Sequence, residues 1–388
     1  MSAVSRRRAG LSTLAIHGDA APRSVADPVA PPVYQSSTFV APFGPADEVL
    51  YTRYGNNPNQ LRLAERLARL EGAEAALFAA SGMGATALAH LAVLRPGDHI
   101  LSSEWIYGGT RRLFLEEFRR FGIDTSFANP DRRRDWRSKL RKNTRAIFVE
   151  TPTNPLLRVL DVDWLAVLAK AEGIPLLVDS TFATPINYRP LEHGADIVIH
   201  SATKYLNGHS DVIAGAVAGG EAFVQEAREK MKLWGQAIDP HAAWLVERGL
   251  KTLAVRMARH DETGLRVATW LEQHPKVRRA HYPGLASHPD HALAKQVLGG
   301  FGGMVGIELA GGGRSADRFL RALRLITHAP SLGGVESLVS EPRYTSHASL
   351  TPDERAAAGI PDGFLRVSLG LEDADDLLAD LARGLAAA

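Results

Sequence analysis

The sequence reads D-I-V-I-H-S-A-T-K-Y-L-N-G at residues 196–208. The short apolar run at 197–199 is typical of a buried strand. Two hydroxyl side chains that could donate to an anion, Ser201 and Thr203, follow this run, and Lys204 comes next. Burying an ammonium group is costly, and that cost lowers the pKa of a lysine toward a neutral, nucleophilic amine. Such an amine can form a Schiff base with an aldehyde cofactor, whereas an ordinary strand-to-helix turn would carry a solvated lysine.

A second apolar run, at residues 174–178, ends in Asp179. An acid at the carboxyl end of a buried parallel strand points into the ligand crevice of an open α/β sheet. Pyridoxal phosphate (PLP) needs a carboxylate on its ring nitrogen and a lysine on its aldehyde. Asp179 and Lys204 would supply both groups from neighbouring strand ends. Together they favour a PLP site over a solvated turn.

Composition limits the class of protein. With 388 residues, 45% of them hydrophobic and 23% charged, the chain can form two or more domains around a large core. The net charge of +2 is too small to indicate a nucleic-acid partner, and the basic run at 131–142 is typical of a solvated helix face. The sequence has no cysteine, which excludes disulfides, thiolate catalysis and cysteine-ligated metals. We expect no metal site.

The sequence also bears on location. No apolar run reaches the roughly 18 residues of a membrane span, so we expect no membrane partner. Residues 5–8, S-R-R-R, resemble part of a twin-arginine signal, but no apolar region follows them. We therefore expect a cytoplasmic enzyme.

Predicted strands and helices alternate from residue 60 to about residue 220, which indicates a mostly parallel sheet with helices on both faces. We expect three parts. These are an N-terminal arm at 1–60 that contacts the neighbouring subunit, a PLP-binding large domain at 61–255 and a smaller α+β domain at 256–388. Within them the pattern predicts a glycine-rich turn at 215–220 and one long helix at 242–270.

Other residues are candidates for the site. S-G-M-G-A at 81–85 opens a predicted helix, and glycines there expose backbone N–H groups that bind phosphate. Tyr107 could stack on a cofactor ring or simply pack a helix end. Asn154 follows the predicted strand at 146–150 and could reach a ligand. Arg366 lies inside an apolar strand, where its partner is either a substrate carboxylate or an internal acid.

Three motifs resemble the trans-sulfuration (Cys/Met metabolism) family of PLP enzymes: Y-T-R-Y-G-N at 51–56, S-G-M-G-A at 81–85 and H-S-A-T-K-Y-L-N-G-H-S-D-V at 200–212. The resemblance covers about residues 11–388. It implies a fold-type-I subunit with a mostly parallel seven-stranded sheet and a smaller C-terminal domain. It also implies a homotetramer built from two active dimers.

The resemblance assigns roles residue by residue. Within one subunit it implies an aldehyde-binding lysine, a ring-nitrogen acid, a ring-stacking tyrosine, an asparagine near the phenolic oxygen and a phosphate cradle: Lys204, Asp179, Tyr107, Asn154, Gly82, Met83, Ser201 and Thr203. Lys204, Tyr107 and Asp179 are the catalytic members of that set. Tyr51 and Arg53 match residues that reach the neighbouring subunit's phosphate, and Arg366 matches the residue that binds the substrate's α-carboxylate.

The segment S-L-G-G-V-E-S-L at 331–338 resembles cystathionine γ-lyases and γ-synthases. This adds Ser331 and Glu336 to the substrate-binding set, with the acid on the distal part of cystathionine. Arg112 also matches the γ-lyases. Gly109 stands where methionine γ-lyases carry a cysteine, and Leu332 replaces the tryptophan of enterobacterial cystathionine β-lyases.

The expected reaction is γ-elimination on a sulfur amino acid such as cystathionine, which gives a 2-oxo acid, ammonia and a thiol. The alternatives are γ-replacement of an activated homoserine by cysteine, methionine γ-lyase and cystathionine β-lyase. An aminotransferase would share the lysine and the acid. Leu50 and the segment at 341–347, with Tyr344 in place of a common methionine, depart from the family pattern near the expected substrate mouth.

Overall fold

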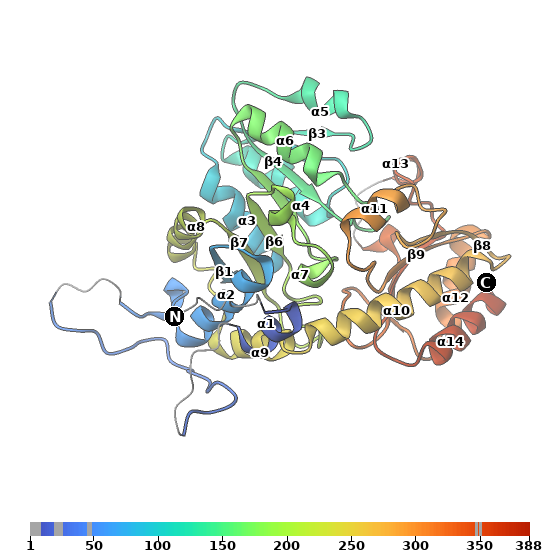
Figure 1. The fold of residues 1–388 in the computed structure, drawn as a ribbon. Coiled ribbons are helices and arrows are strands. Elements are labelled where there is room, and N and C mark those ends of the chain that lie inside the picture. Colours follow the sequence, from blue (N-terminus) through green and yellow to red (C-terminus); the bar gives the residue numbers. More distant parts are fainter. Residues whose placement is uncertain (1–8, 19–25, 45–48, 346–347, 349–350) are drawn as a thin grey trace, which may run out of the picture.

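The computed structural model describes residues 9–18, 26–44, 49–345, 348 and 351–388. Residues 5–8, considered above as part of a signal, and residues 346–347 of the substrate-mouth segment lie outside these ranges. The described chain forms two sheets that lie side by side, each covered by helices (Figure 1).

The larger sheet has seven strands in the order β1-β7-β6-β5-β4-β2-β3. Only β7 runs antiparallel to its neighbours, so the predicted mostly parallel α/β sheet is confirmed. The strands are β1 (Ala75–Ala79), β2 (His99–Ser103), β3 (Asp124–Ala128), β4 (Thr144–Glu150), β5 (Leu176–Asp179), β6 (Ile197–His200) and β7 (Gly215–Gly219).

Side chains of successive residues in these strands point to opposite faces. Phe148 and Leu177 pack on one face with α3 (Gly82–Val93), α8 (Glu221–Trp234) and the π-helical turn η2 (Leu113–Phe118). Val149 and Val178 pack on the other face. The helices on that second face are α2 (Pro58–Glu71), α5 (Arg133–Lys139), α6 (Val162–Glu172) and α9 (Pro240–Leu250).

The smaller sheet has five strands in the order β10-β11-β12-β9-β8. They are β8 (Val277–His281), β9 (Met304–Leu309), β10 (Thr327–His328), β11 (Leu338–Ser340) and β12 (Phe364–Ser368). Its core includes residues of α10 (Leu253–Glu272), α12 (Gly312–Ala322) and α14 (Ala374–Ala387). The remaining helices are α1 (Leu11–His17), η1 (Thr52–Tyr54), α4 (Gly108–Arg112), α7 (Thr184–Asn187), η3 (Pro190–His193), α11 (His291–Val297), η4 (Pro342–Tyr344) and α13 (Pro352–Ala357).

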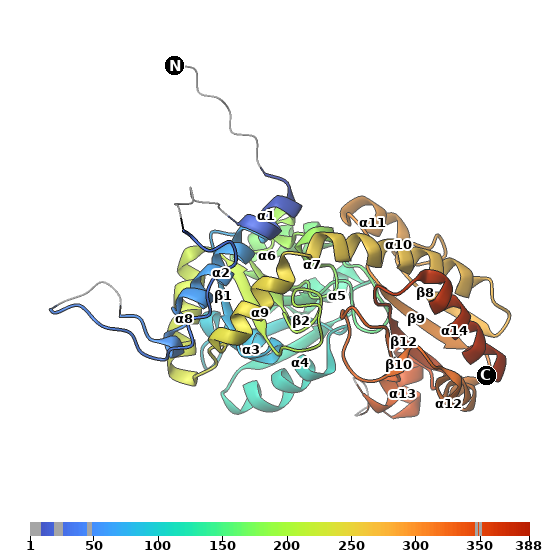
Figure 2. The same ribbon diagram turned by 90° about the horizontal axis from the view of Figure 1, so that it is seen from below.

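Helix α10 joins the two sheets. Leu253 and Met257, near its start, belong to the core beside the large sheet, whereas Val267 and Leu271, near its end, belong to the core of the small sheet. Both views show it running between the two parts (Figures 1 and 2). Twenty residues of helix span about 30 Å, so one continuous element fixes the spacing of the two sheets.

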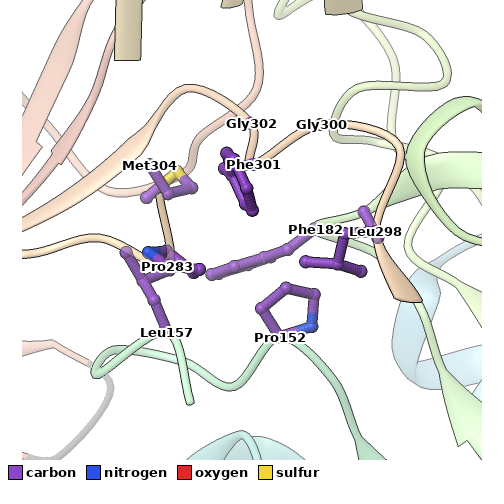
Figure 3. Close-up of a pocket in the computed structure, with 10 residues that line it drawn as sticks. Pro152, Leu157, Phe182, Pro283, Leu298, Gly300, Phe301, Gly302 and Met304 are labelled. Carbon is purple, nitrogen blue, oxygen red and sulfur yellow. The ribbon is translucent and has the colours of Figure 1, made fainter. Parts of the chain in front are cut away.

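A dry seam also connects the two parts. Side chains from the large-sheet side and from the loops before β9 converge on a void of about 10 Å³ (Figure 3). Phe182 lies in the middle of the group, with Phe301 and Met304 on one side and Pro152 on the other. An apolar void of this size does not retain a water molecule, so the contact is closed by side-chain packing alone.

The glycine-rich turn predicted at 215–220 is wrong, because residues 215–219 form strand β7. The glycine at 215 serves close packing. A Cβ there would lie 2.1 Å from the backbone oxygen of Ser81, which is the N-cap residue of α3. The strand therefore allows the start of α3 to approach the sheet.

The single helix predicted at 242–270 is also wrong, because α9 ends at Leu250 and α10 begins at Leu253. The carbonyl of Gly249 accepts from Thr252 Oγ1 at 3.1 Å and from Arg256 Nη2 at 2.9 Å. These side chains satisfy a carbonyl near the helix end.

The basic run at 131–142 includes α5, a short surface helix whose Trp136 is buried in the core. Several of its charges face acids, among them Arg133 with Asp161 at 2.7 Å and Lys139 with Asp135 at 2.8 Å. This arrangement agrees with the predicted solvated face.

Replacing Gly215 by Ala should push the start of α3 away from the sheet. We expect Gly215→Ala to cost about 1–3 kcal/mol of stability, as for other overpacked core positions, measured as a lower midpoint in urea denaturation. Gly220→Ala is the matched control, since its Cβ would meet nothing closer than 3.5 Å and φ is −66°. Equal midpoints for the two variants would contradict the close-packing role of Gly215.

Candidate active site

A cavity of about 400 Å³ lies where β4, β5 and β6 end and α3 begins. Most of the predicted site residues line it: Gly82, Met83, Tyr107, Asn154, Asp179, Ser201, Thr203, Lys204, Ser331 and Arg366. Further walls come from Ser81, Thr86, Thr110, Glu150, Thr181, Phe182, Ile213, Pro330, Leu332 and Thr345. Residues far apart in the sequence thus meet at the carboxyl edge of the large sheet.

Lys204 follows β6 and directs its amine into the cavity. Lys204 Nζ donates to Ser331 Oγ at 2.8 Å. Burial, together with the nearby Arg366 guanidinium, lowers the pKa of Lys204 to about 8. The amine is therefore much closer to its neutral form at physiological pH than a solvated lysine would be.

Asp179 is the last residue of β5. Its Oδ1 accepts from the backbone N–H of Thr181 at 3.0 Å and from Thr181 Oγ1 at 2.5 Å. The same Thr181 hydroxyl accepts from Ser201 N at 2.9 Å, so it links the acid to the loop that carries Lys204. Burial raises the pKa of Asp179 above its usual value, which a cationic partner on this carboxyl would reverse.

The start of α3 forms the other end of the cavity. Ser81 caps this helix through a 3.0 Å bond from Gly84 N to its hydroxyl. A Cβ at position 82 would lie 2.7 Å from Ser201 Oγ, so only glycine lets the loop after β6 approach the helix this closely. Thr203 Oγ1 bonds the backbone of Ala214 at 3.1 and 3.0 Å.

Arg366 reaches the cavity from β12 of the small sheet. Its guanidinium donates to Asn154 Oδ1 at 2.9 Å and to the backbone oxygen of Ser331 at 3.0 Å. Arg366 Nε is buried and has no hydrogen-bond partner in the described part of the chain. No carboxylate among the described residues forms an ion pair with this guanidinium, so it has capacity to bind an external one.

Tyr107 stands at the start of α4, with its ring partly exposed in the cavity wall. The ring also fills the space beside Gly109. A Cβ at 109 would lie 2.4 Å from Tyr107 Cε1.

Glu150 is the residue that the sequence reasoning missed. It ends β4 opposite Asp179 in β5, and it is buried. Burial and the neighbouring Asp179 raise the pKa of Glu150 to about 8. Its position in the sequence could have identified it, because it ends a predicted strand just as Asp179 does.

Four predicted residues do not line this cavity in the single chain: Tyr51, Arg53, Arg112 and Glu336. The Arg53 guanidinium donates to the backbone oxygen of Lys232 and lies 5.4 Å from the Tyr51 ring centre. Arg112 pairs with Glu116 at 3.0 Å on the exposed face of its helix. Glu336 is exposed and accepts from Ser210 Oγ at 3.1 Å.

The residues present fit PLP. A partly desolvated amine, an acid at a neighbouring strand end and a helix start beside two hydroxyl side chains line one cavity. A helix N-terminus binds phosphate through its free N–H groups. These are the three attachment points of the cofactor.

Comparison with known proteins agrees with this chemistry. The family model described as Cys/Met metabolism PLP-dependent enzyme matches residues 12–386. The chain belongs to this family. It is a PLP-dependent enzyme, and the predicted resemblance is confirmed.

Members of the family that resemble this chain carry different names. L-methionine gamma-lyase of Fusobacterium nucleatum subsp. polymorphum is 39% identical, with 98% of each chain covered. Cystathionine gamma-lyase of Bacillus subtilis (strain 168) is 41% identical, covering 96% of this chain and 98% of the relative. A solved cystathionine gamma synthase of Xanthomonas oryzae pv. oryzae, in complex with aminoacrylate and cysteine, has a TM-score of 0.93 and 40% identity, covering 97% of this chain and 98% of the other. The family includes both lyases and synthases.

Two further features of this Cys/Met metabolism enzyme concern metals and membranes. Within the described ranges, no group of three His, Cys, Asp or Glu side chains is placed to hold a metal ion. None of the described helices is both long and apolar enough to cross a membrane.

The pKa of Lys204 predicts how the apoenzyme captures its cofactor. Only the neutral amine attacks an aldehyde, so the rate of covalent PLP attachment should rise about tenfold per pH unit below pH 8 and level off above it. Stopped-flow absorbance of the bound cofactor measures this rate. Lys204→Ala is the control and should show no covalent attachment. A rate that still rises between pH 9 and pH 10 would indicate a solvated lysine.

Proposed function

We propose that this enzyme catalyses γ-elimination on a sulfur amino acid of the cystathionine type, releasing a 2-oxo acid, ammonia and a thiol. The observation that carries the substrate class is the position of Arg366, a buried guanidinium without a carboxylate partner in the described chain, in the same cavity as the Lys204 amine. The guanidinium can bind the α-carboxylate of an amino acid, and the amine can accept its α-proton.

The roles of the residues follow from their positions. PLP, when bound, supplies an electron-withdrawing ring that stabilises negative charge at the substrate's α-carbon. Arg366 and Asn154 hold the α-carboxylate. Lys204 would hold the cofactor aldehyde, and its amine would take the α-proton of the substrate. Asp179 would keep a proton on the ring nitrogen. Tyr107, in the cavity wall, would pack against the ring.

The packing around Gly109 supports cystathionine over methionine as substrate. Methionine γ-lyases carry a cysteine at the matching position, and here the Tyr107 ring occupies the space that a side chain at 109 would need. The segment with Ser331 and Glu336 resembles enzymes that act on cystathionine. Glu336 is exposed within this segment, outside the cavity wall, and we assign it to the distal amino group.

The second candidate is γ-replacement, in which cysteine displaces the leaving group of an activated homoserine. The observation that favours it is the TM-score of 0.93 with a solved cystathionine gamma synthase whose complex contains cysteine. Elimination and replacement need the same residues up to departure of the γ-substituent, so only the products separate them.

A product assay tests the reaction. We expect kcat/KM for cystathionine to exceed that for methionine by about tenfold or more, because a pocket that pairs a distal charged group rejects a substrate lacking it. Release of 2-oxo acid and thiol would be measured by chromatography, with Lys204→Ala as the inactive control. Formation of cystathionine from O-succinyl- or O-acetylhomoserine plus cysteine at a higher kcat/KM would establish replacement instead.

The proposal includes an assembly of two active dimers, with the arm at 1–60 on the neighbouring subunit, the large domain at 61–255 and the small domain at 256–388. The arm supports this. It is held to the body near Pro31, whose backbone oxygen accepts from Trp244 Nε1 at 2.8 Å, and part of the segment that follows extends away from the body in both views (Figures 1 and 2). Apolar side chains on the arm are fully exposed, including Val40 at 102% and Phe43 at 106%. Such surface is typical of a covered interface. In the assembly, Tyr51 and Arg53 would reach the partner's phosphate site.

Mixing two inactive variants tests the shared site. Arg53→Ala should weaken cofactor binding in the neighbouring site, because lysine or alanine cannot replace the planar fork of arginine on phosphate. When Arg53→Ala and Lys204→Ala subunits exchange, half of the dimers are mixed and each has one intact site. Activity should then recover to about a quarter of the wild-type value.

Two controls accompany the mixing. Arg53→Ala exchanged with itself should show no recovery, and native mass spectrometry should detect the mixed dimers. Mixed dimers without recovered turnover, from an Arg53→Ala variant that is itself inactive, would show that Arg53 acts within its own chain.

A further inference from the structure

The buried carboxyl group of Glu150 connects the two sides of the cavity. Its strand, β4, pairs with β5 in parallel register, with Glu150 opposite Asp179. Both side chains therefore point to the same face of the sheet, two residues beyond Phe148 and Leu177. This is the face on which α3 packs, and Glu150 and Asp179 both line the cofactor cavity.

Each oxygen of Glu150 holds a different loop. Oε2 accepts from the backbone N–H of Tyr107 at 2.7 Å. Oε1 accepts from the backbone N–H of Asn154 at 2.7 Å. One loop follows β2 and carries the tyrosine of the cavity wall, whereas the other follows β4. A single carboxyl group thus sets the distance between two loops that are not adjacent in sequence.

The connection continues to the groups that would contact substrate. Asn154 Oδ1 accepts from Arg366 Nη1 at 2.9 Å. Arg366 Nη2 donates to the backbone oxygen of Ser331 at 3.0 Å, and the Ser331 hydroxyl accepts from Lys204 at 2.8 Å. In this series of hydrogen bonds, Glu150 is the residue that also bonds Tyr107.

We propose that Glu150 is a positioning residue that holds the ring-facing Tyr107 and the substrate-facing Asn154–Arg366 pair in fixed register. Its effect on Tyr107 concerns the cofactor and is independent of the reaction. Its effect through Arg366 on the substrate carboxylate rests on the proposed function.

The carboxyl group is specifically suited to this position. Two N–H donors approach its two oxygens, and both oxygens can accept. A glutamine has the same shape but only one accepting oxygen, so one of the two N–H groups would face an NH₂ group. The buried position lets little water compensate for the lost bond. Burial and the neighbouring Asp179 raise the pKa of Glu150 to about 8, and the N–H groups of Tyr107 and Asn154 oppose that rise because they stabilise the ionised form, which accepts at both oxygens.

The test compares Glu150→Gln with a matched control in the holoenzyme and the apoenzyme. The control is Asp380→Asn, since Asp380 is also buried and accepts three backbone N–H bonds, from Arg324, Leu325 and Ile326, at 2.9 Å. It belongs to α14, which packs on the small sheet. Each variant replaces a buried carboxyl group that accepts backbone N–H bonds with an amide. Only Glu150 lies in the cavity.

Three readouts are expected to change in Glu150→Gln. Hydrogen–deuterium exchange in the apoenzyme should quicken at least about tenfold in the peptides that contain Tyr107 or Asn154. The visible circular dichroism of bound PLP, measured without substrate, should lose intensity because the ring is less firmly oriented. KM for the preferred amino acid should rise about tenfold. Asp380→Asn should leave all three unchanged while lowering the unfolding temperature.

Unchanged exchange and dichroism in folded Glu150→Gln would overturn the proposal, as would equal changes in Asp380→Asn. Glu150→Asp provides a second variant if the amide does not fold, because it keeps both oxygens but is one methylene too short to hold both loops. It should quicken exchange at one of the two peptides. The exchange and dichroism experiments contain no substrate, so their outcome does not depend on which reaction the enzyme catalyses.

Discussion

Two cations share one buried cavity, and the arrangement of the site depends on how the protein accommodates them. Burial lowers the pKa of both groups, and the Arg366 guanidinium lowers the pKa of Lys204 further. No acid among the described residues forms an ion pair with either of them. They are held by uncharged oxygens instead, those of Ser331 and Asn154. Neutral acceptors keep the cations in place without neutralising them, so both remain able to pair with an anionic substrate group.

The acids and the Arg366 guanidinium reach the cavity from different sheets. Glu150 and Asp179 come from the ends of adjacent strands of the large sheet, whereas Arg366 comes from the small sheet. The distance between them is therefore set by whatever fixes the two sheets. Helix α10 and the dry seam at Phe182 have that function.

The sequence predicted the parts of the site that follow local rules. Lys204 and Asp179 could be identified because each follows a short apolar run, and the ends of neighbouring parallel strands meet at one edge. Glu150 obeys the same rule, but a glutamate at a strand end belongs to no distinctive motif, and the pattern after this strand indicates only Asn154. The sequence predicts a turn at Gly215 because glycine is common in turns. In the structure this glycine lies in a strand and allows another backbone to approach closely. Packing of this kind depends on the partner element, Ser81 at the start of α3, which local sequence does not reveal.

The residues that line the cavity fall into two groups that differ in how well they tolerate substitution. The acids and the helix start belong to the ends of regular elements, and Lys204 lies in the turn after β6. The rim is formed by side chains such as Ile213, Leu332 and Thr345, which lie in connecting loops. Loops tolerate substitution better than the elements they connect. Substitutions at the rim can therefore alter which leaving group is accepted without changing the residues at the base of the cavity. Relatives about 40% identical to this chain carry the names of different reactions.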